Sequence, residues 1–252
     1  MLATDVGNAE SDYDSDVNSL FDEPLGSSSS LTRPDEQRPG RPIPGLYFTP
    51  TVLLPPDLMH LIMQKCIDTY FRDGDVNQVM LFERAGQDGE NSIPLNSTLP
   101  AFLIDLLTTL STTLEPHLPA NVHSLLFPSA SASKYARQVI INHYLPGEGI
   151  SPHVDLLDRF ADGIIGVSMG SGCTMRFRKE TEWEVYLPSG SVYVMTEEAR
   201  YEWTHEIEKH AEDWVLDEGG REGGKWIPRS VRVSVTFRWL LPGADVVGPG
   251  NA

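Results

Sequence analysis

The sequence predicts a mostly β protein with flanking helices, an α+β fold in which a β-sandwich or barrel is covered by helices from the N-terminal half. Two stretches before residue 115 have the features of helices. From Gln138 onward the pattern changes to short apolar runs separated by turn signals, which is typical of a sheet built from many short strands.

The first helix is predicted from about Pro55 to Phe71, because Pro55, Pro56 and Asp57 supply the prolines and the acid that a first helical turn favours. The second is predicted from about Leu99 to Leu114. Its apolar residues form one stripe at helical spacing, made of Leu99, Phe102, Leu103, Leu106, Leu107, Leu110 and Leu114. This stripe indicates a helix that packs on a core and needs no chemical role.

Strands are predicted over residues 139–141, 164–168, 174–177, 191–195 and 231–237. Turn signals such as Leu145-Pro146-Gly147 separate them. The polar stretch from Lys209 to Lys225 contains two Gly-Gly pairs and is predicted to be a mobile loop.

The chain is strongly acidic, with a net charge of −17 over 252 residues. Residues 1–40 carry −7 of this charge and are rich in Ser, Asp, Gly and Pro, so we expect a disordered acidic tail that could dock on a partner protein. The charge argues against nucleic-acid binding through a general basic surface. Basic residues recur near the C-terminal end, and a local positive cleft on an acidic body is compatible with this distribution.

Cys66 and Cys173 fit no metal or redox spacing, so we expect buried reduced thiols. The sequence has no run of about 18 apolar residues and begins with no basic, apolar leader. We therefore expect a protein without a membrane span, located in the cytoplasm, the nucleus or both.

His153-Val154-Asp155 places two metal-binding side chains on one side of an extended segment. An imidazole and a carboxylate are two of the three ligands in the facial triad of non-haem Fe(II) oxygenases, although His-x-Asp alone also occurs in surface turns. The triad needs a second histidine from a distant strand. His205 is the favoured candidate and His210, inside a charged loop, is the competitor.

Arg232 and Arg238 are six positions apart, an even number that puts both guanidinium groups on one face of a strand together with Ser234. Two inward arginines are costly to bury without anions, and a dicarboxylate would pair with them. Two arginines on a solvated strand face are an equally good explanation of this pair taken alone.

These motifs, taken together, resemble the AlkB family of Fe(II)/2-oxoglutarate dioxygenases. The resemblance rests on Asn142-His143-Tyr144 with its Pro-Gly turn, His153-Val154-Asp155, His205 and the Arg232–Arg238 strand, in that order. It covers about residues 44–241, between the tail 1–43 and a C-terminal tail 242–252. The eukaryotic branch that contains the tRNA wobble-uridine hydroxylase and a protein-lysine demethylase is the most similar.

The resemblance implies a double-stranded β-helix core, jelly-roll or cupin-like, with the N-terminal helices packed outside. It implies that His153, Asp155 and His205 bind Fe(II), and that O2 and 2-oxoglutarate complete the reaction. Arg232 would pair with the distal carboxylate of 2-oxoglutarate and Arg238 would approach the carboxylate next to the keto group. Asn142 and Tyr144 would hydrogen-bond the cosubstrate, and Ser234 shares their site.

The segment 77–82 is similar to the family's substrate lid, with Asn77, Gln78, Met80 and Phe82 as its contact residues. Leu157 stands where base-demethylating relatives carry an acid, which disfavours methylated adenine or cytosine as the substrate. Arg84, Arg159 and Arg200 are predicted around the cleft, where they would contact a backbone phosphate.

Three biological roles are compatible with these residues. The first is an oxygenase that hydroxylates or demethylates a modified nucleic acid, with tRNA favoured. The second is a protein-directed oxygenase acting on methyl-lysine, which the acidic surface would favour. The third is an inactive scaffold that binds a partner through its acidic tail; the complete triad and the arginine pair count against it.

We expect that residues 1–40 can be deleted without changing metal affinity or melting temperature, because they lack the apolar content to join a core. Differential scanning fluorimetry and a metal titration of the truncated and full chains test this. A loss of many degrees on deletion would show that the tail packs on the domain.

Overall fold

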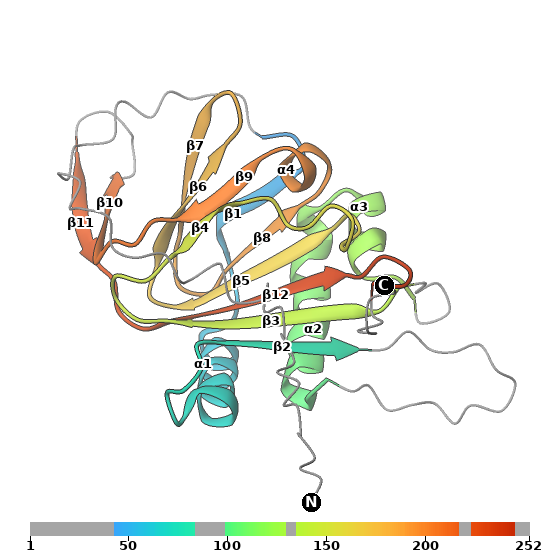
Figure 1. Cartoon of the computed structure of the whole chain (residues 1–252), viewed down its shortest axis with the longest axis horizontal. Coiled ribbons are helices and arrows are strands. Elements are labelled where there is room, and N and C mark those ends of the chain that lie inside the picture. The colour runs from blue at the N-terminus through green and yellow to red at the C-terminus, as the bar shows by residue number, and fades with distance from the viewer. Residues whose placement is uncertain (1–42, 84–98, 130–134, 217–222, 245–252) are drawn as a thin grey trace, which may run out of the picture. The chain divides into compact units, whose positions relative to one another are not determined.

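A computed structural model of the protein describes residues 43–83, 99–129, 135–216 and 223–244. Within these residues two antiparallel sheets face each other (Figure 1). The main sheet has the strand order β1 (Leu46–Leu53), β8 (Ser191–Met195), β5 (Ile164–Gly170), β12 (Arg232–Trp239), β3 (Arg137–Tyr144) and β2 (Gln78–Glu83). The minor sheet has the order β4 (Ile150–His153), β9 (Thr204–Ile207), β6 (Cys173–Arg178) and β7 (Glu182–Leu187).

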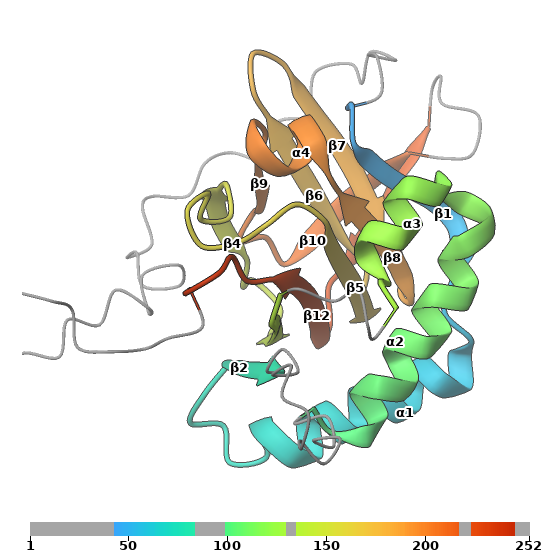
Figure 2. The same ribbon diagram turned by 90° about the vertical axis from the view of Figure 1, so that its right-hand side faces the viewer.

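Helices from the N-terminal half cover the outer face of the main sheet (Figure 2). They are α1 (Pro56–Cys66), its π-helical continuation η1 (Ile67–Phe71), α2 (Ala101–Leu114), the 3-10 turn η2 (Glu115–His117) and α3 (Ala120–Leu126). Each α-helix of this group begins directly after a proline, whose fixed φ and missing N–H are tolerated there: Pro55, Pro100 and Pro119. The short α4 (Glu197–Tyr201) lies between β8 and β9.

Alternation along the central strand β12 separates an apolar face from a polar one. Val233, Val235 and Phe237 join the core beneath the helices. Arg232 and Ser234 are also buried but lie on the opposite face, where Arg232 lines a small cavity together with Cys173 of β6 and Ile207 of β9 in the minor sheet. The inner face of the minor sheet supplies a second apolar cluster that includes Met175, Phe177 and Ile207. The polar face of β12 and this second cluster therefore line the space between the two sheets.

The predicted fold class is confirmed, and so are the two predicted helices and the five predicted strands. Cys66 and Cys173 are free and buried, as expected. No helix in the described part of the chain is long and apolar enough to cross a membrane. The acidic tail 1–43 lies outside the described residues except for Ile43, and so does most of the C-terminal tail 242–252.

The prediction of a loop from Lys209 to Lys225 was wrong, because this stretch contributes to a two-stranded ribbon. Strands β10 (Glu212–Leu216) and β11 (Gly224–Pro228) pair antiparallel, with Trp214 opposite Trp226. The two indole rings meet edge to face, with centroids 5.4 Å apart. Asp213 anchors the ribbon through a buried ion pair with Arg229, in which Nε lies 2.6 Å from Oδ2. The aromatic pair and this ion pair stabilise two strands that the polar composition of the segment does not predict.

Candidate metal and cosubstrate site

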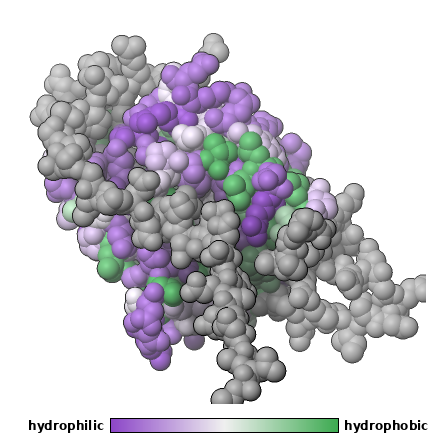
Figure 3. Space-filling model, in the orientation of Figure 1, coloured by the Kyte–Doolittle hydropathy of each residue, from purple (hydrophilic) through white to green (hydrophobic). Residues whose placement is uncertain are grey.

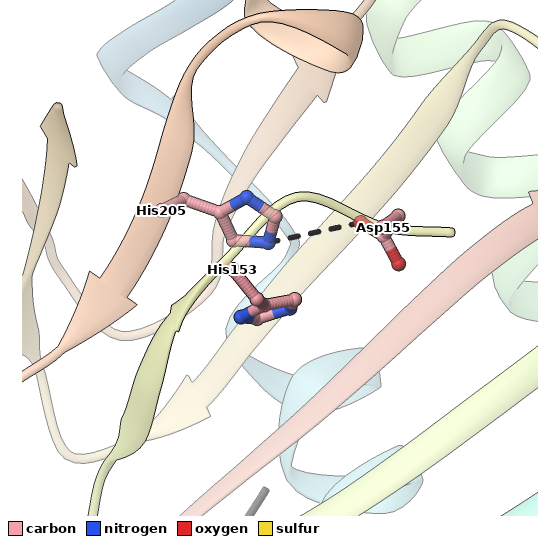
Figure 4. Close-up of side chains that lie close together, drawn as sticks. All are labelled: His153, Asp155 and His205. Atoms are coloured by element: carbon pink, nitrogen blue, oxygen red, sulfur yellow. Dashed lines mark ion pairs between the residues drawn. The ribbon is translucent and has the colours of Figure 1, made fainter. Parts of the chain in front are cut away.

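Three side chains of the metal-binding type meet between the sheets (Figure 4). His153 ends β4 and lies directly opposite His205 of β9, so the strand register itself brings the two imidazoles together. Asp155 follows two residues later, in the loop after β4. The potential ligand atoms of His153, Asp155 and His205 all lie within 4.8 Å of one another. The sequence prediction that these three residues converge is therefore confirmed.

Burial and neighbouring charges keep Asp155 and His205 in the deprotonated form that a metal requires. Burial would raise the pKa of Asp155, but the guanidinium of Arg238 and the neighbouring histidines outweigh it and lower this pKa to about 2. Burial lowers the pKa of His205 to about 3, and the adjacent His153 acts in the same direction. At neutral pH the pair is a carboxylate beside a neutral imidazole, as metal ligation needs.

The third ligand, His153, is oriented by its own strand. Its Nδ1 lies 2.8 Å from the carbonyl oxygen of Ser151. A carbonyl only accepts hydrogen bonds, so Nδ1 carries the proton and Nε2 keeps a lone pair for a metal. Two imidazoles and one carboxylate in this arrangement fit the facial triad of a non-haem Fe(II) site.

Arg232 is a buried cation with spare hydrogen-bonding capacity. It is 4% exposed, and its Nε donates to Ser168 Oγ at 2.9 Å. Its guanidinium lies over the ring of Tyr144, 4.9 Å from the ring centroid. Its Nη1 has no hydrogen-bond partner, and no carboxylate of the described segments forms an ion pair with it. A carboxylate of the cosubstrate would satisfy this donor, so the residues fit 2-oxoglutarate.

The remaining predicted cosubstrate residues lie on the same face. Ser234 lies opposite Asn142 in the β12–β3 pair, and both are buried. The amide of Asn142 accepts a hydrogen bond of 2.8 Å from Gln78 Nε2 on the edge strand β2. These contacts form a polar strip next to Arg232, where a cosubstrate would be held by hydrogen bonds.

Arg238, at the other end of β12, contacts the metal-binding carboxylate itself. Its Nη1 donates to Asp155 Oδ1, and its Nη2 donates to Gln138 Oε1 at 2.6 Å. Its guanidinium also covers the ring of Phe160 at 3.8 Å. The structure thus gives Arg238 a role in neutralising Asp155, while its contact with 2-oxoglutarate stays a prediction. Gln138, two strand periods before Asn142, was missed although its even spacing from Asn142 could have indicated it.

The competing histidine, His210, lies elsewhere, and so does His143. The side chain of His210 is 37% exposed and lies 3.5 Å from Glu208. His143 points toward the helices, where its ring stacks on Phe71 with centroids 5.3 Å apart. Neither belongs to the metal-binding cluster.

The predicted lid is the edge strand β2 of the main sheet. Gln78, Met80 and Phe82 lie opposite Asn142, Ile140 and Gln138, which places their side chains on the inner face. Phe82 is 39% exposed. Asn77 precedes the strand, and its carbonyl accepts the His143 amide at 2.8 Å. The segment therefore borders the site, and its role as a lid stays a prediction.

The prediction that Arg200 lines an open cleft was wrong, because Arg200 is 1% exposed and cannot meet a phosphate. Arg159 is partly buried. Arg84 lies outside the described residues. Sequence spacing gave no sign that Arg200 points inward, because the five-residue α4 is too short to show a helical period.

Residues 94–238 match the model of the 2OG-Fe(II) oxygenase superfamily, which covers more than half of the chain. The chain belongs to this superfamily. Within it the chain is AlkB-like, as the sequence motifs predicted, and Fe(II), 2-oxoglutarate and O2 are its cofactors.

Three curated proteins illustrate the similarity. Uncharacterized protein L905 of Acanthamoeba polyphaga mimivirus is 41% identical over 108 residues, covering 41% of this chain and 48% of that protein. The tRNA (carboxymethyluridine(34)-5-O)-methyltransferase ALKBH8 of Mus musculus is 38% identical over 112 residues, covering 40% of this chain and 17% of that protein. The N6-methyladenosine RNA demethylase ALKBH of Cryphonectria parasitica is 26% identical over 152 residues, covering 50% of this chain and 66% of that protein. The aligned part thus covers less than two thirds of each relative.

We expect His153→Ala to abolish metal binding and the slow conversion of 2-oxoglutarate to succinate, because one of three ligands is lost. His153 is only partly buried, so the melting temperature of the metal-free protein should stay within a few degrees. A metal titration and succinate detection by mass spectrometry give the answer. His210→Ala is the matched control and should behave as wild type; undiminished succinate production by His153→Ala would contradict the assignment.

We expect Arg232→Lys to raise the apparent KM for 2-oxoglutarate by about tenfold or more, because lysine keeps the charge and loses the planar fork. The change should appear as weaker cosubstrate binding with unchanged metal affinity. Steady-state kinetics across 2-oxoglutarate concentrations measure it, with Arg178→Lys on the outer face of the minor sheet as the control. An unchanged KM would mean that the free donor of Arg232 serves another purpose.

Proposed function

We propose that this AlkB-like dioxygenase oxidises a modified nucleic acid, with tRNA as the preferred substrate class, and that His153, Asp155 and His205 are its iron ligands. The observation that carries the metal role is the convergence of these three side chains between the sheets. Arg232, a buried arginine with a free donor on the inner face of β12, supports the cosubstrate. Similarity to proteins named for tRNA and RNA modification supports the substrate class.

The residues of the site have two roles, metal binding and cosubstrate binding. His153, Asp155 and His205 hold the metal, and Arg232 with its polar neighbours binds and orients the carboxylates of 2-oxoglutarate. Iron with this cosubstrate supplies the oxidation, in which O2 is consumed, 2-oxoglutarate becomes succinate and carbon dioxide, and a substrate C–H becomes C–OH. When that carbon is an N-methyl group, the hydroxylated product releases formaldehyde.

Two exposed leucines, called the rim below, stand next to the metal cluster. Leu156 and Leu157 directly follow Asp155, and they are 57% and 56% exposed. Apolar side chains of this kind favour an unstacked base over a phosphate backbone as their contact. This arrangement supports a target in a single-stranded region, such as a tRNA loop, over a methylated base in a long duplex.

A protein substrate is the second candidate, and a specific observation favours it. On the outer face of the minor sheet Arg176 and Arg178 lie among four carboxylates, from Glu182, Glu184, Glu206 and Glu208. Hydrophilic side chains dominate the upper part of Figure 3, where Figure 1 places β6 and β7. An excess of negative charge there would attract a basic peptide carrying methyl-lysine and repel a phosphate backbone.

Full-length protein supplied with Fe(II), 2-oxoglutarate and O2 should release more succinate with bulk tRNA than without it. Mass spectrometry of the tRNA nucleosides should show a hydroxylated or demethylated product, and His153→Ala should give neither signal. Stimulation should fall steeply as salt rises, because phosphate contacts release counterions. Stimulation by a methyl-lysine peptide with none by tRNA would move the assignment to the protein-directed activity.

We expect Leu157→Ser to raise the KM for the tRNA substrate several-fold, because a contact surface of the rim becomes polar. Metal affinity and substrate-free succinate production should stay near wild type. The Leu157 side chain is 56% exposed and does not belong to the metal-binding cluster. Leu61→Ser on α1, which is 50% exposed and covers the opposite face of the main sheet, is the matched control. Equal effects of the two substitutions would exclude a role of Leu157 at the substrate.

A further inference from the structure

Arg200 is among the largest side chains that the described residues bury completely, with 1% of its surface exposed. Burying a guanidinium is costly unless its donors are satisfied. No carboxylate among the described residues forms an ion pair with Arg200 within bonding distance. The compensation for this buried charge must come from other acceptors.

Those acceptors are backbone carbonyls of a single loop. Nη1 donates to the carbonyl of Asp155 at 3.0 Å, and Nη2 donates to Leu156 at 3.2 Å and to Phe160 at 3.0 Å. Nε donates to Ala161 at 3.4 Å. The fork of Arg200 thus binds both ends of the loop between Asp155 and Ala161, which leads from the metal cluster toward β5.

The same loop holds α4 in return. Asp162 Oδ1 accepts the amide of Glu197 at 3.1 Å, at the start of α4, and the amide of Gly163 at 2.9 Å. Arg200 lies on α4, five residues before His205. Two side chains, Arg200 and Asp162, therefore tie the segment that carries Asp155 to the segment that leads into His205.

We propose that Arg200 is a positioning residue of the metal site, which fixes Asp155 relative to His205 and thereby sets metal affinity. The proposal rests on the metal role proposed for His153, Asp155 and His205. Arg200 touches none of the reacting groups; it acts through the backbone of Asp155. By drawing the loop carbonyls inward, it also leaves Leu156 and Leu157 turned toward solvent at the rim.

The test compares Arg200→Lys with Arg229→Lys in the full-length protein. Both arginines are buried and both donate to backbone carbonyls. Arg229, however, donates to the carbonyls of Glu148 and Glu208 and to the carboxylate of Asp213 in the ribbon. Co(II) is the probe, because its absorption spectrum reports coordination geometry as well as occupancy. An ammonium cannot reproduce a fork that binds several carbonyls.

Arg200→Lys should weaken Co(II) affinity by about 10- to 100-fold and alter its absorption bands, as loss of an outer partner of a ligand does. The KM for 2-oxoglutarate at saturating metal should stay near wild type. Arg229→Lys should leave the Co(II) spectrum unchanged. A wild-type Co(II) affinity and spectrum in folded Arg200→Lys, or equal losses in both variants, would overturn the proposal.

Asp162→Asn carries the test if Arg200→Lys does not fold, because it weakens the reciprocal contact and leaves the buried guanidinium in place. It should lower Co(II) affinity without changing the KM for 2-oxoglutarate, and unchanged Co(II) affinity would overturn the proposal. Wild-type protein that binds no Co(II) at all would instead refute the metal site itself. The two failures are thus distinguishable.

Discussion

The register between β4 and β9 is the constraint on which the site depends. It sets His153 opposite His205 across two strands that are 52 positions apart in the sequence. A slip of one residue in either strand would turn one imidazole to the outer face of the minor sheet. The apolar neighbours resist such a slip, because Ile207 lies in the inner core while Glu206 pairs with arginines outside. Packing of the minor sheet therefore holds the ligand geometry.

Three arginines of the site, the buried Arg200 and Arg232 and the partly buried Arg238, are each compensated in a different way. Arg238 is neutralised by Asp155, and Arg200 by the carbonyls of the loop that carries Asp155. Arg232 donates to the Ser168 hydroxyl and lies over the Tyr144 ring, but its Nη1 is free. In Arg238 the atom without a hydrogen-bond partner is the inner Nε. An unsatisfied buried donor is costly, and among these three side chains only Arg232 leaves a terminal nitrogen free to meet a ligand. That difference separates a binding residue from two residues that shape the metal site.

The sequence was sufficient to predict the helices and strands whose side chains follow a regular helical or strand period. Even spacing on β12 predicted that Arg232 and Ser234 face one side, and the leucine stripe predicted α2. It was insufficient where burial depends on a distant partner. The edge strand β2 and the ribbon strands have polar or mixed patterns that become strands only beside β3 or each other. Arg200 was misassigned for the same reason, since its acceptors lie about 40 residues earlier in the chain.

Charge and shape together constrain how a substrate can reach the metal. The outer face of the minor sheet carries more carboxylates than cations, and Lys179 adds contacts with Glu198 and Glu202 next to it. That face would repel the phosphate backbone of the proposed nucleic-acid substrate, which would then approach the metal cluster beside the exposed Leu156 and Leu157. Those side chains offer contact to a base and little attraction to phosphate. The energy that holds such a substrate would then come from the extruded nucleotide, which favours a target that is already unpaired.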